Sequence, residues 1–215
     1  EQILMKSDGF PTYNFANVVD DHLMGITDVV RGMEYLSSTP KYNLIYNAFE
    51  WEIPRYIHCP PVMKDEHNKL SKRNGDASFQ DLVAKGYLPG AILNYIALLG
   101  WSPEEDKEIF TLDELVQAFN VKHIGKVGAI FDPDKLKWIN GMWLRGMDLD
   151  SYYDLVKPYI DQAVKGDFDG KKIAAILQQR AETLVEIPGM LDFFDEFPAY
   201  DNALYVNKKM KTTLD

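Results

Sequence analysis

The arrangement of hydrophobic and polar residues divides the chain into an α/β part up to about residue 63 and an all-α part after about residue 76. Apolar and β-branched runs in the first part predict strands at residues 3–6, 12–15, 26–31 and 55–62. The run at 26–31 is typical of a buried parallel strand. Helices are predicted at 17–24 and from Thr39, the expected N-cap before Pro40. This order is that of half a doubly wound sheet, whose ligands bind beyond the carboxyl ends of the strands.

The second part of the chain carries helix start and stop signals and no competing strand pattern. Helices are expected at 78–86, 89–99, 151–164, 171–186 and 188–195, with further helix starts at Ser102, Thr111 and Asp132. The stretch at 146–150 contains glycine and two aspartates, and we interpret it as a junction between helical units.

Composition narrows the class of protein without identifying it. With 215 residues, of which 46% are hydrophobic and 26% charged, the chain is ordinary globular material. No apolar run approaches the roughly 18 residues of a membrane span, so we expect a cytoplasmic protein with no membrane partner. The single cysteine, Cys59, leaves no disulfide framework and no cysteine zinc site, and no metal site is predicted. A net charge of −10 disfavours non-specific nucleic acid binding but permits a local basic groove for a selective RNA.

The stretch Lys69-Leu70-Ser71-Lys72-Arg73 has the chemistry of a polyphosphate-binding loop. Two lysines three residues apart supply compact positive charges on flexible stems, and a serine adds a hydroxyl beside them. The loop is not a Walker loop, because the required glycines do not precede it. A Lys-rich pentapeptide is more often a solvated basic turn, so the interpretation depends on the flanking sequence.

The flanking sequence shows a family resemblance over residues 1 to about 145. The matching stretches are residues 8–32, Leu36-Ser37-Ser38-Thr39-Pro40, the pentapeptide Lys69-Leu70-Ser71-Lys72-Arg73, and residues 86–89, 93–95, 98–102, 131–132 and 136–141. In this order they closely resemble bacterial-type glutamyl-tRNA synthetase, a class I aminoacyl-tRNA synthetase whose second signature is the lysine loop. So long a collinear match is far more specific than the pentapeptide alone.

The resemblance implies a fold and three domains. Residues 1–64 correspond to the second half of a class I Rossmann-like nucleotide fold. Residues 65–148 correspond to the signature-lysine loop and a helical stem-contact domain, and residues 149–215 to the start of a helical anticodon-binding domain. The implied reaction joins L-glutamate to tRNA(Glu) through a glutamyl-adenylate, with ATP as substrate, Mg²⁺ accompanying ATP, and a monomeric enzyme.

The resemblance also assigns candidate site residues. The amino acid pocket corresponds to Tyr13, Asn17 and Arg31, the adenosine and tRNA-terminus contact to Glu34, and the ATP site to Lys69, Ser71 and Lys72, with the two lysines catalytic. Arg31 is the most informative, because a guanidinium pairs with the side-chain carboxylate of glutamate, whereas glutamine offers no charge. The family commonly has Arg-Gly-Glu-Glu-His in this segment, and the chain departs from it at Met33 and Tyr35.

The first class I signature, His-Ile-Gly-His or a near relative, is not found in these 215 residues. His123-Ile124-Gly125-Lys126 resembles it, but follows the lysine loop, ends in lysine and falls in an expected helical stretch. We therefore expect a carboxyl-side fragment that binds tRNA weakly and does not aminoacylate by itself. Two other classes stay open: a non-catalytic tRNA-binding protein, and a glutaminyl-tRNA synthetase-like protein, in which the arginine that reads the carboxylate is typically replaced.

Overall fold

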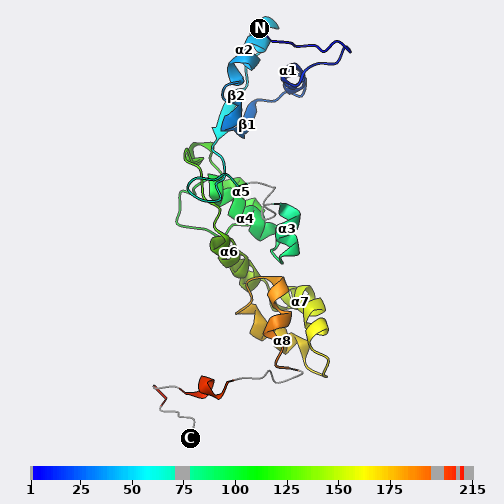
Figure 1. Ribbon diagram of the computed structural model, residues 1–215, viewed down its shortest axis with the longest axis vertical. Coiled ribbons are helices and arrows are strands. Elements are labelled where there is room, and N and C mark those ends of the chain that lie inside the picture. Colours follow the sequence, from blue (N-terminus) through cyan, green and yellow to red (C-terminus); the bar gives the residue numbers. More distant parts are fainter. Residues whose placement is uncertain (1, 71–77, 195–200, 207–208, 211–215) are drawn as a thin grey trace. The chain divides into compact units, whose positions relative to one another are not determined.

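The computed structural model describes residues 2–70, 78–194, 201–206 and 209–210 (Figure 1). The chain separates into two units. Unit 1 comprises Glu1–Asn74, Ile96–Asp106 and Val116–Phe131, and unit 2 comprises Gly75–Tyr95, Lys107–Leu115 and Asp132–Asp215. The finer division into domains at residues 64 and 148 stays a prediction.

A parallel pair of short strands organises unit 1 (Figure 1). Strand β1 (Asp28–Gly32) pairs with β2 (Arg55–Cys59), so that Arg31 lies opposite His58. Helix α1 (Tyr13–Leu23) precedes β1, and a 3-10 turn, η1 (Met33–Tyr35), and helix α2 (Thr39–Ala48) connect the two strands. The predicted order of helix, strand, helix and parallel strand is confirmed.

The core of unit 1 lies where α1 and α2 pack against each other. Its buried residues are Val18, Tyr42, Ile45 and Tyr46, with Phe15, Trp51 and Tyr56 packed against them. The imidazole of His22 stacks on the Trp51 ring, with the centroids 3.9 Å apart and the planes at 2°. Burial of side chains of this size contributes about 1.5–3 kcal/mol each. Because Tyr56 belongs to β2, the cluster also connects that strand to the two helices.

The predicted strand at 12–15 is wrong, because Tyr13 already begins α1. Thr12 is the extended residue before the helix, and its hydroxyl donates to the carbonyls of Ile3 and Leu4 at 3.0 and 3.1 Å. This side-chain bond ties the preceding segment to the start of α1. Among the described residues here, β-type pairing is limited to the isolated bridge between Met5 and Pro11.

Three further expectations for unit 1 need correction. Strand β1 is not buried on both faces, because Val29 is 9% exposed but Val30 is 59% exposed, and β2 is its only partner in the described residues. Strand β2 ends at Cys59 rather than at residue 62, since Pro60 and Pro61 cannot donate to a strand ladder. The N-cap of α2 is Ser38 rather than Thr39.

Helices dominate the chain after residue 78, as predicted, and no strand lies in the part described there. They are α3 (Phe79–Ala84), α4 (Pro89–Gly100), α5 (Leu112–Ala118), α6 (Pro133–Gly146), α7 (Leu149–Ala163) and α8 (Gly170–Gln178), with 3-10 turns η3 (Val121–His123), η4 (Leu184–Glu186), η5 (Pro188–Met190) and η6 (Asn202–Tyr205). Two predicted caps are confirmed: Ser78 accepts from the amide of Asp81, and Asp132 accepts from the amides of Asp134 and Lys135. No helix in the described ranges is long and apolar enough to cross a membrane.

The main core of unit 2 lies between α7 and α8, which pack side by side (Figure 1). Its buried residues include Leu144, Tyr152, Val156, Ile160, Ile173, Leu177, Ile187 and Leu191. Buried amides connect the surrounding segments. Gln178 donates to the carbonyls of Leu144 and Met147, and Asn140 on α6 accepts from the amide of Leu88 and donates to the carbonyl of Glu182.

Three of the predicted helices are absent or shorter than expected, because other hydrogen bonds form in their place. No helix begins at Ser102, because its amide donates to the carbonyl of His123 and the neighbouring Trp101 forms an antiparallel bridge with Ile124. Helix α8 ends at Gln178 instead of residue 186. The Glu186 carboxylate accepts from the amide of Thr183, and this bond caps the start of the separate turn η4. The helix expected at 188–195 is only the turn η5 in its described part.

Candidate functional site

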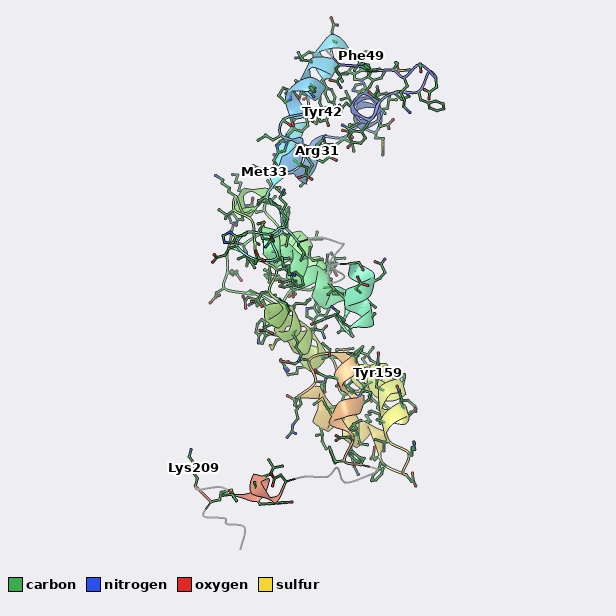
Figure 2. The ribbon with its side chains drawn as sticks, in the orientation of Figure 1. Arg31, Met33, Tyr42, Phe49, Tyr159 and Lys209 are labelled. Atoms are coloured by element: carbon green, nitrogen blue, oxygen red, sulfur yellow. The ribbon has the colours of Figure 1, made fainter. Side chains whose placement is uncertain are left out.

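Arg31 lies near the carboxyl end of β1, where α1, η1 and α2 hold its guanidinium. Its Nη2 donates to the Asn17 side-chain oxygen on α1 at 3.3 Å. Its Cζ lies 4.5 Å from the ring centre of Tyr35 and 5.2 Å from that of Tyr42. Figure 2 shows Arg31 and Tyr42 close together in this part of unit 1. Two aromatic faces and one amide therefore restrict the guanidinium.

Two further donor atoms of the Arg31 guanidinium are not used by the protein. Its Nε and Nη1 atoms are buried and have no hydrogen-bond partner among the described residues. Buried polar groups are normally hydrogen-bonded, and an unpaired donor costs about 1–3 kcal/mol, more when it is charged. The arrangement is therefore suited to a small anionic group, above all a carboxylate, at the guanidinium.

Tyr13, the first residue of α1, reaches the same cluster from the surface. Its side chain is 59% exposed, and its ring centroid lies 6.5 Å from that of Tyr35. A hydrogen bond between the two side chains raises the pKa of the Tyr35 phenol. The structure thus brings together Tyr13, Asn17 and Arg31, which were predicted to form one pocket.

Glu34 lies in η1, immediately after β1. Its side chain is exposed, and its carboxylate folds back into the space that a Cβ atom on Gly32 would occupy. A glycine at position 32 therefore lets Glu34 lie against the end of the strand.

Lys69 stands on the second arm of a short hairpin at the base of the lysine loop. It forms an antiparallel bridge with Met63, and the amide of Leu70 donates to the carbonyl of Val62 at 3.0 Å. The Asp65 carboxylate closes the turn by accepting from the Asn68 amide at 2.8 Å. The lysine itself is exposed. The other predicted phosphate ligands, Ser71 and Lys72, lie outside the described residues.

A second segment supports this hairpin within unit 1. The amide of Met63 donates to the carbonyl of Ala129, and the amide of Phe131 donates to the carbonyl of Met63, both at 2.8 Å. A Cβ atom on Gly128 would lie 2.7 Å from the carbonyl oxygen of Pro61, so only glycine permits this approach. The base of the lysine loop is consequently held on two sides by backbone contacts.

Burial raises the pKa of several acidic groups around Arg31. Burial raises the pKa of the Asp21 carboxyl, and the positive charge of Arg31 opposes that rise. Burial also raises the pKa of Tyr56, again opposed by Arg31, and raises that of Tyr46 to about 12. Electrostatic interactions are stronger in such surroundings than in water, so an ion pair with Arg31 would be correspondingly selective.

Sequence reasoning missed the aromatic residues that hold Arg31. The sequence marks Tyr35 only as a departure from the family pattern, and it does not mark Tyr42 as a site residue. The phenol of Tyr42 donates to the Asn14 side-chain oxygen at 3.2 Å, which fixes the ring beside Arg31. The pairing of α1 with α2 creates this contact, so no local pattern could have signalled it.

His123-Ile124-Gly125-Lys126 has structural contacts instead of the position of a nucleotide signature. His123 ends η3 and lies 3.6 Å from a carboxylate oxygen of Glu104, while Ile124 pairs with Trp101. The segment therefore lies in a 3-10 turn and a bridge, not in a helix. Within the described ranges, no cluster of three or more His, Cys, Asp or Glu side chains is arranged to hold a metal ion.

The family is shown by two matches that together cover most of the chain. Residues 1–138 match the family described as tRNA synthetases class I (E and Q), catalytic domain, and residues 151–215 match the anticodon binding domain. The chain therefore belongs to the class I aminoacyl-tRNA synthetases of the glutamate and glutamine group.

Individual relatives within this family are glutamate–tRNA ligases. The chain is 60% identical over 215 residues to the glutamate–tRNA ligase of Clostridium botulinum (strain Hall) and 62% identical to that of Clostridium kluyveri, covering 100% of this chain and 44% of each relative. A crystal structure of a glutamate tRNA ligase from Elizabethkingia meningosepticum, in complex with its amino acid, matches with a TM-score of 0.85 and 31% identity, over 97% of this chain and 46% of that one. The chain thus spans less than half the length of the curated relatives that it matches.

Proposed function

We propose that the product of the full reading frame containing this chain ligates L-glutamate to tRNA(Glu). ATP and glutamate form a glutamyl-adenylate with release of pyrophosphate, and the glutamyl group then passes to the terminal ribose of the tRNA. The observation that carries the proposal is Arg31, which has two buried and unpaired donor atoms near the carboxyl end of β1. Among natural amino acids, these donors select a carboxylate side chain.

In this proposal, the cluster around Arg31 binds the amino acid. The guanidinium pairs with the side-chain carboxylate, Asn17 limits its rotation through Nη2, and Tyr13 contributes a phenol at the exposed side. The crystal structure of the Elizabethkingia relative was determined in complex with its amino acid, which supports an amino acid site in this fold. Glu34 is proposed to contact the adenosine or the tRNA terminus.

The lysine loop is proposed to act on the phosphates of ATP. Lys69 and Lys72 stabilise the negative charge that develops as pyrophosphate leaves, and the Ser71 hydroxyl donates a hydrogen bond to the phosphate oxygens. Mg²⁺ bound together with ATP would neutralise part of the phosphate charge. The hairpin at Met63 and Asp65 places the base of this loop.

The helical part of the chain is proposed to bind tRNA. The match of residues 151–215 to an anticodon binding domain supports this role for the region after residue 148, and residues 65–148 are proposed to contact the acceptor stem. The enzyme is proposed to work as a monomer in the cytoplasm.

A glutaminyl-tRNA synthetase is the main alternative, since the family covers both activities. Glutamine would leave the positive charge of Arg31 unpaired in a partly buried site, which costs several kcal/mol. A non-catalytic tRNA-binding protein would not need Tyr13, Asn17, Arg31 and the lysines together.

Aminoacylation assays with radiolabelled amino acids test the proposal. The full reading-frame product should charge tRNA(Glu) with glutamate at a kcat/KM at least about 100-fold above that for glutamine. The 215-residue chain alone should give no glutamyl-tRNA, because it contains no first class I signature. Preferential formation of glutaminyl-tRNA, or no charging by the full product, would contradict the proposal. Glutamyl-tRNA formed by the 215-residue chain would contradict the assigned need for a first signature.

A further inference from the structure

Tyr35 provides the nearer of the two aromatic faces that contact Arg31. Its ring centre lies 4.5 Å from the guanidinium carbon, compared with 5.2 Å for Tyr42. The other contact of the guanidinium is the 3.3 Å hydrogen bond to Asn17, and no carboxylate pairs with it among the described residues. The aromatic faces therefore account for most of what holds this charged group in place. At a partly desolvated site, one such contact is worth about 1–2 kcal/mol.

The backbone of Tyr35 is anchored independently of its ring. Its carbonyl oxygen accepts from the amide of Ser38 and from the hydroxyl of Thr39, each at 3.0 Å. The Thr39 hydroxyl also lies 3.1 Å from Nε2 of His58 on β2. Because this hydroxyl has one proton, which goes to Tyr35, Nε2 of His58 is the donor. Replacing the Tyr35 side chain leaves all these contacts intact.

The two rings differ in how firmly they are held. Tyr42 is 1% exposed and its phenol donates to Asn14, so its ring is part of the core. Tyr35 is only half-buried, and its phenol interacts with the exposed Tyr13. The guanidinium therefore contacts one ring that is fixed in the core and one ring that is nearer the solvent, and the Tyr13 contact steadies the second ring.

We propose that Tyr35 is a positioning residue for the amino acid site. Its ring holds the Arg31 guanidinium near Tyr42, in the orientation in which Nε and Nη1 have no partner in the protein and are left for a substrate carboxylate. Tyr35 thereby contributes to the selection of an acidic amino acid without touching it. The expected effect on the KM for glutamate rests on the proposed function, whereas the contact between Tyr35 and Arg31 can be tested independently of that function.

The kinetic test uses the full reading-frame product in tRNA-dependent ATP–pyrophosphate exchange. Tyr35→Leu removes the ring face and should raise the KM for glutamate about tenfold, while the KM for ATP stays within about twofold. Tyr35→Phe and Tyr35→Trp keep an aromatic face and should restore a KM for glutamate within about threefold of the wild type. Tyr159→Leu, the same change at a half-buried tyrosine of α7, serves as the matched control and should leave both KM values unchanged.

A spectroscopic test uses the 215-residue chain itself. The ring current of Tyr35 should shift the Nε–H resonance of Arg31 upfield, and Tyr35→Leu should abolish most of that shift while Tyr35→Phe retains it.

An unchanged Arg31 resonance in Tyr35→Leu would overturn the positioning role. In the exchange assay, an unchanged KM for glutamate in Tyr35→Leu would also overturn the positioning role. A rise in the KM for ATP alone would overturn it as well, because the Tyr35 ring would then act at the nucleotide. If the wild type shows the Arg31 shift but no glutamate-dependent exchange, the proposed function fails and the contact stands.

Discussion

The side-chain oxygen of Asn17 on α1 accepts a hydrogen bond from Nη2 of Arg31 on β1 at 3.3 Å. The bond connects the helix before β1 to the end of that strand. Asn17→Asp would place a carboxylate at this position and neutralise the guanidinium within the protein. We expect the KM for glutamate to rise at least about 30-fold in the exchange assay, because the substrate carboxylate would then compete with an internal one.

Asn17→Ala provides the control for this prediction. It removes the acceptor without adding charge, so we expect a smaller rise in the KM for glutamate, about threefold to tenfold. Equal effects of the alanine and aspartate variants would show that charge at residue 17 does not reach the amino acid site.

Asn140 is predicted to be a main support of unit 2. It is fully buried, accepts from the amide of Leu88 and donates to the carbonyl of Glu182. Asn140→Ala leaves both backbone groups without a partner, and the free energy of unfolding should fall by about 2–4 kcal/mol in urea titrations. Gln162→Ala, at an exposed position of α7, should change it by less than about 0.5 kcal/mol. A loss below about 1 kcal/mol for Asn140→Ala would contradict this role.

The buried phenol of Tyr152 predicts a loss of stability at alkaline pH. Burial raises the pKa of Tyr152 to about 12, whereas the unfolded chain has an ordinary phenol with a pKa of about 10. Because the folded-state pKa is the higher one, this contribution is present in full below about pH 10 and is lost as the pH rises through about 12. At pH 11, Tyr152 alone should cost about 1–1.5 kcal/mol.

Tyr152→Phe tests this linkage directly. The hydroxyl is buried with no hydrogen-bond partner in the described residues, so the variant should be as stable as the wild type, or slightly more stable, at pH 8. Between pH 8 and pH 11, it should lose about 1 kcal/mol less of its free energy of unfolding than the wild type. The same loss in both proteins would show that Tyr152 ionises freely in the folded state.

The sequence predicted the start of a helix correctly where a nearby side chain caps that helix. Asp132 and Ser78 accept from backbone amides within their own first turns, so no distant residue was needed to locate α6 and α3. The failures follow from long-range contacts. The carbonyl of His123 pairs with Ser102 and prevents a helix there, and the exposure of Val30 depends on which strands and helices cover β1.

The candidate site was predictable in its charged residues and not in their supports. Arg31 and Asn17 lie in a stretch that closely resembles a known family, and the structure places them in contact. Tyr35 and Tyr42 both reach the guanidinium because η1 follows β1 directly and α2 packs against α1. A local sequence pattern does not contain that geometry, because Tyr35 follows Arg31 by four positions across the end of a strand and Tyr42 lies on a separate helix.

The most direct test of the account is the discrimination between glutamate and glutamine by Arg31→Gln in the full reading-frame product. With tRNA(Glu) present, kcat/KM for glutamate should fall at least about 100-fold, since the buried charge that pairs with the carboxylate is gone. The value for glutamine should change by less than about tenfold, so the preference for glutamate should collapse. A variant that retains the wild-type preference would show that another residue reads the carboxylate and would contradict the central claim.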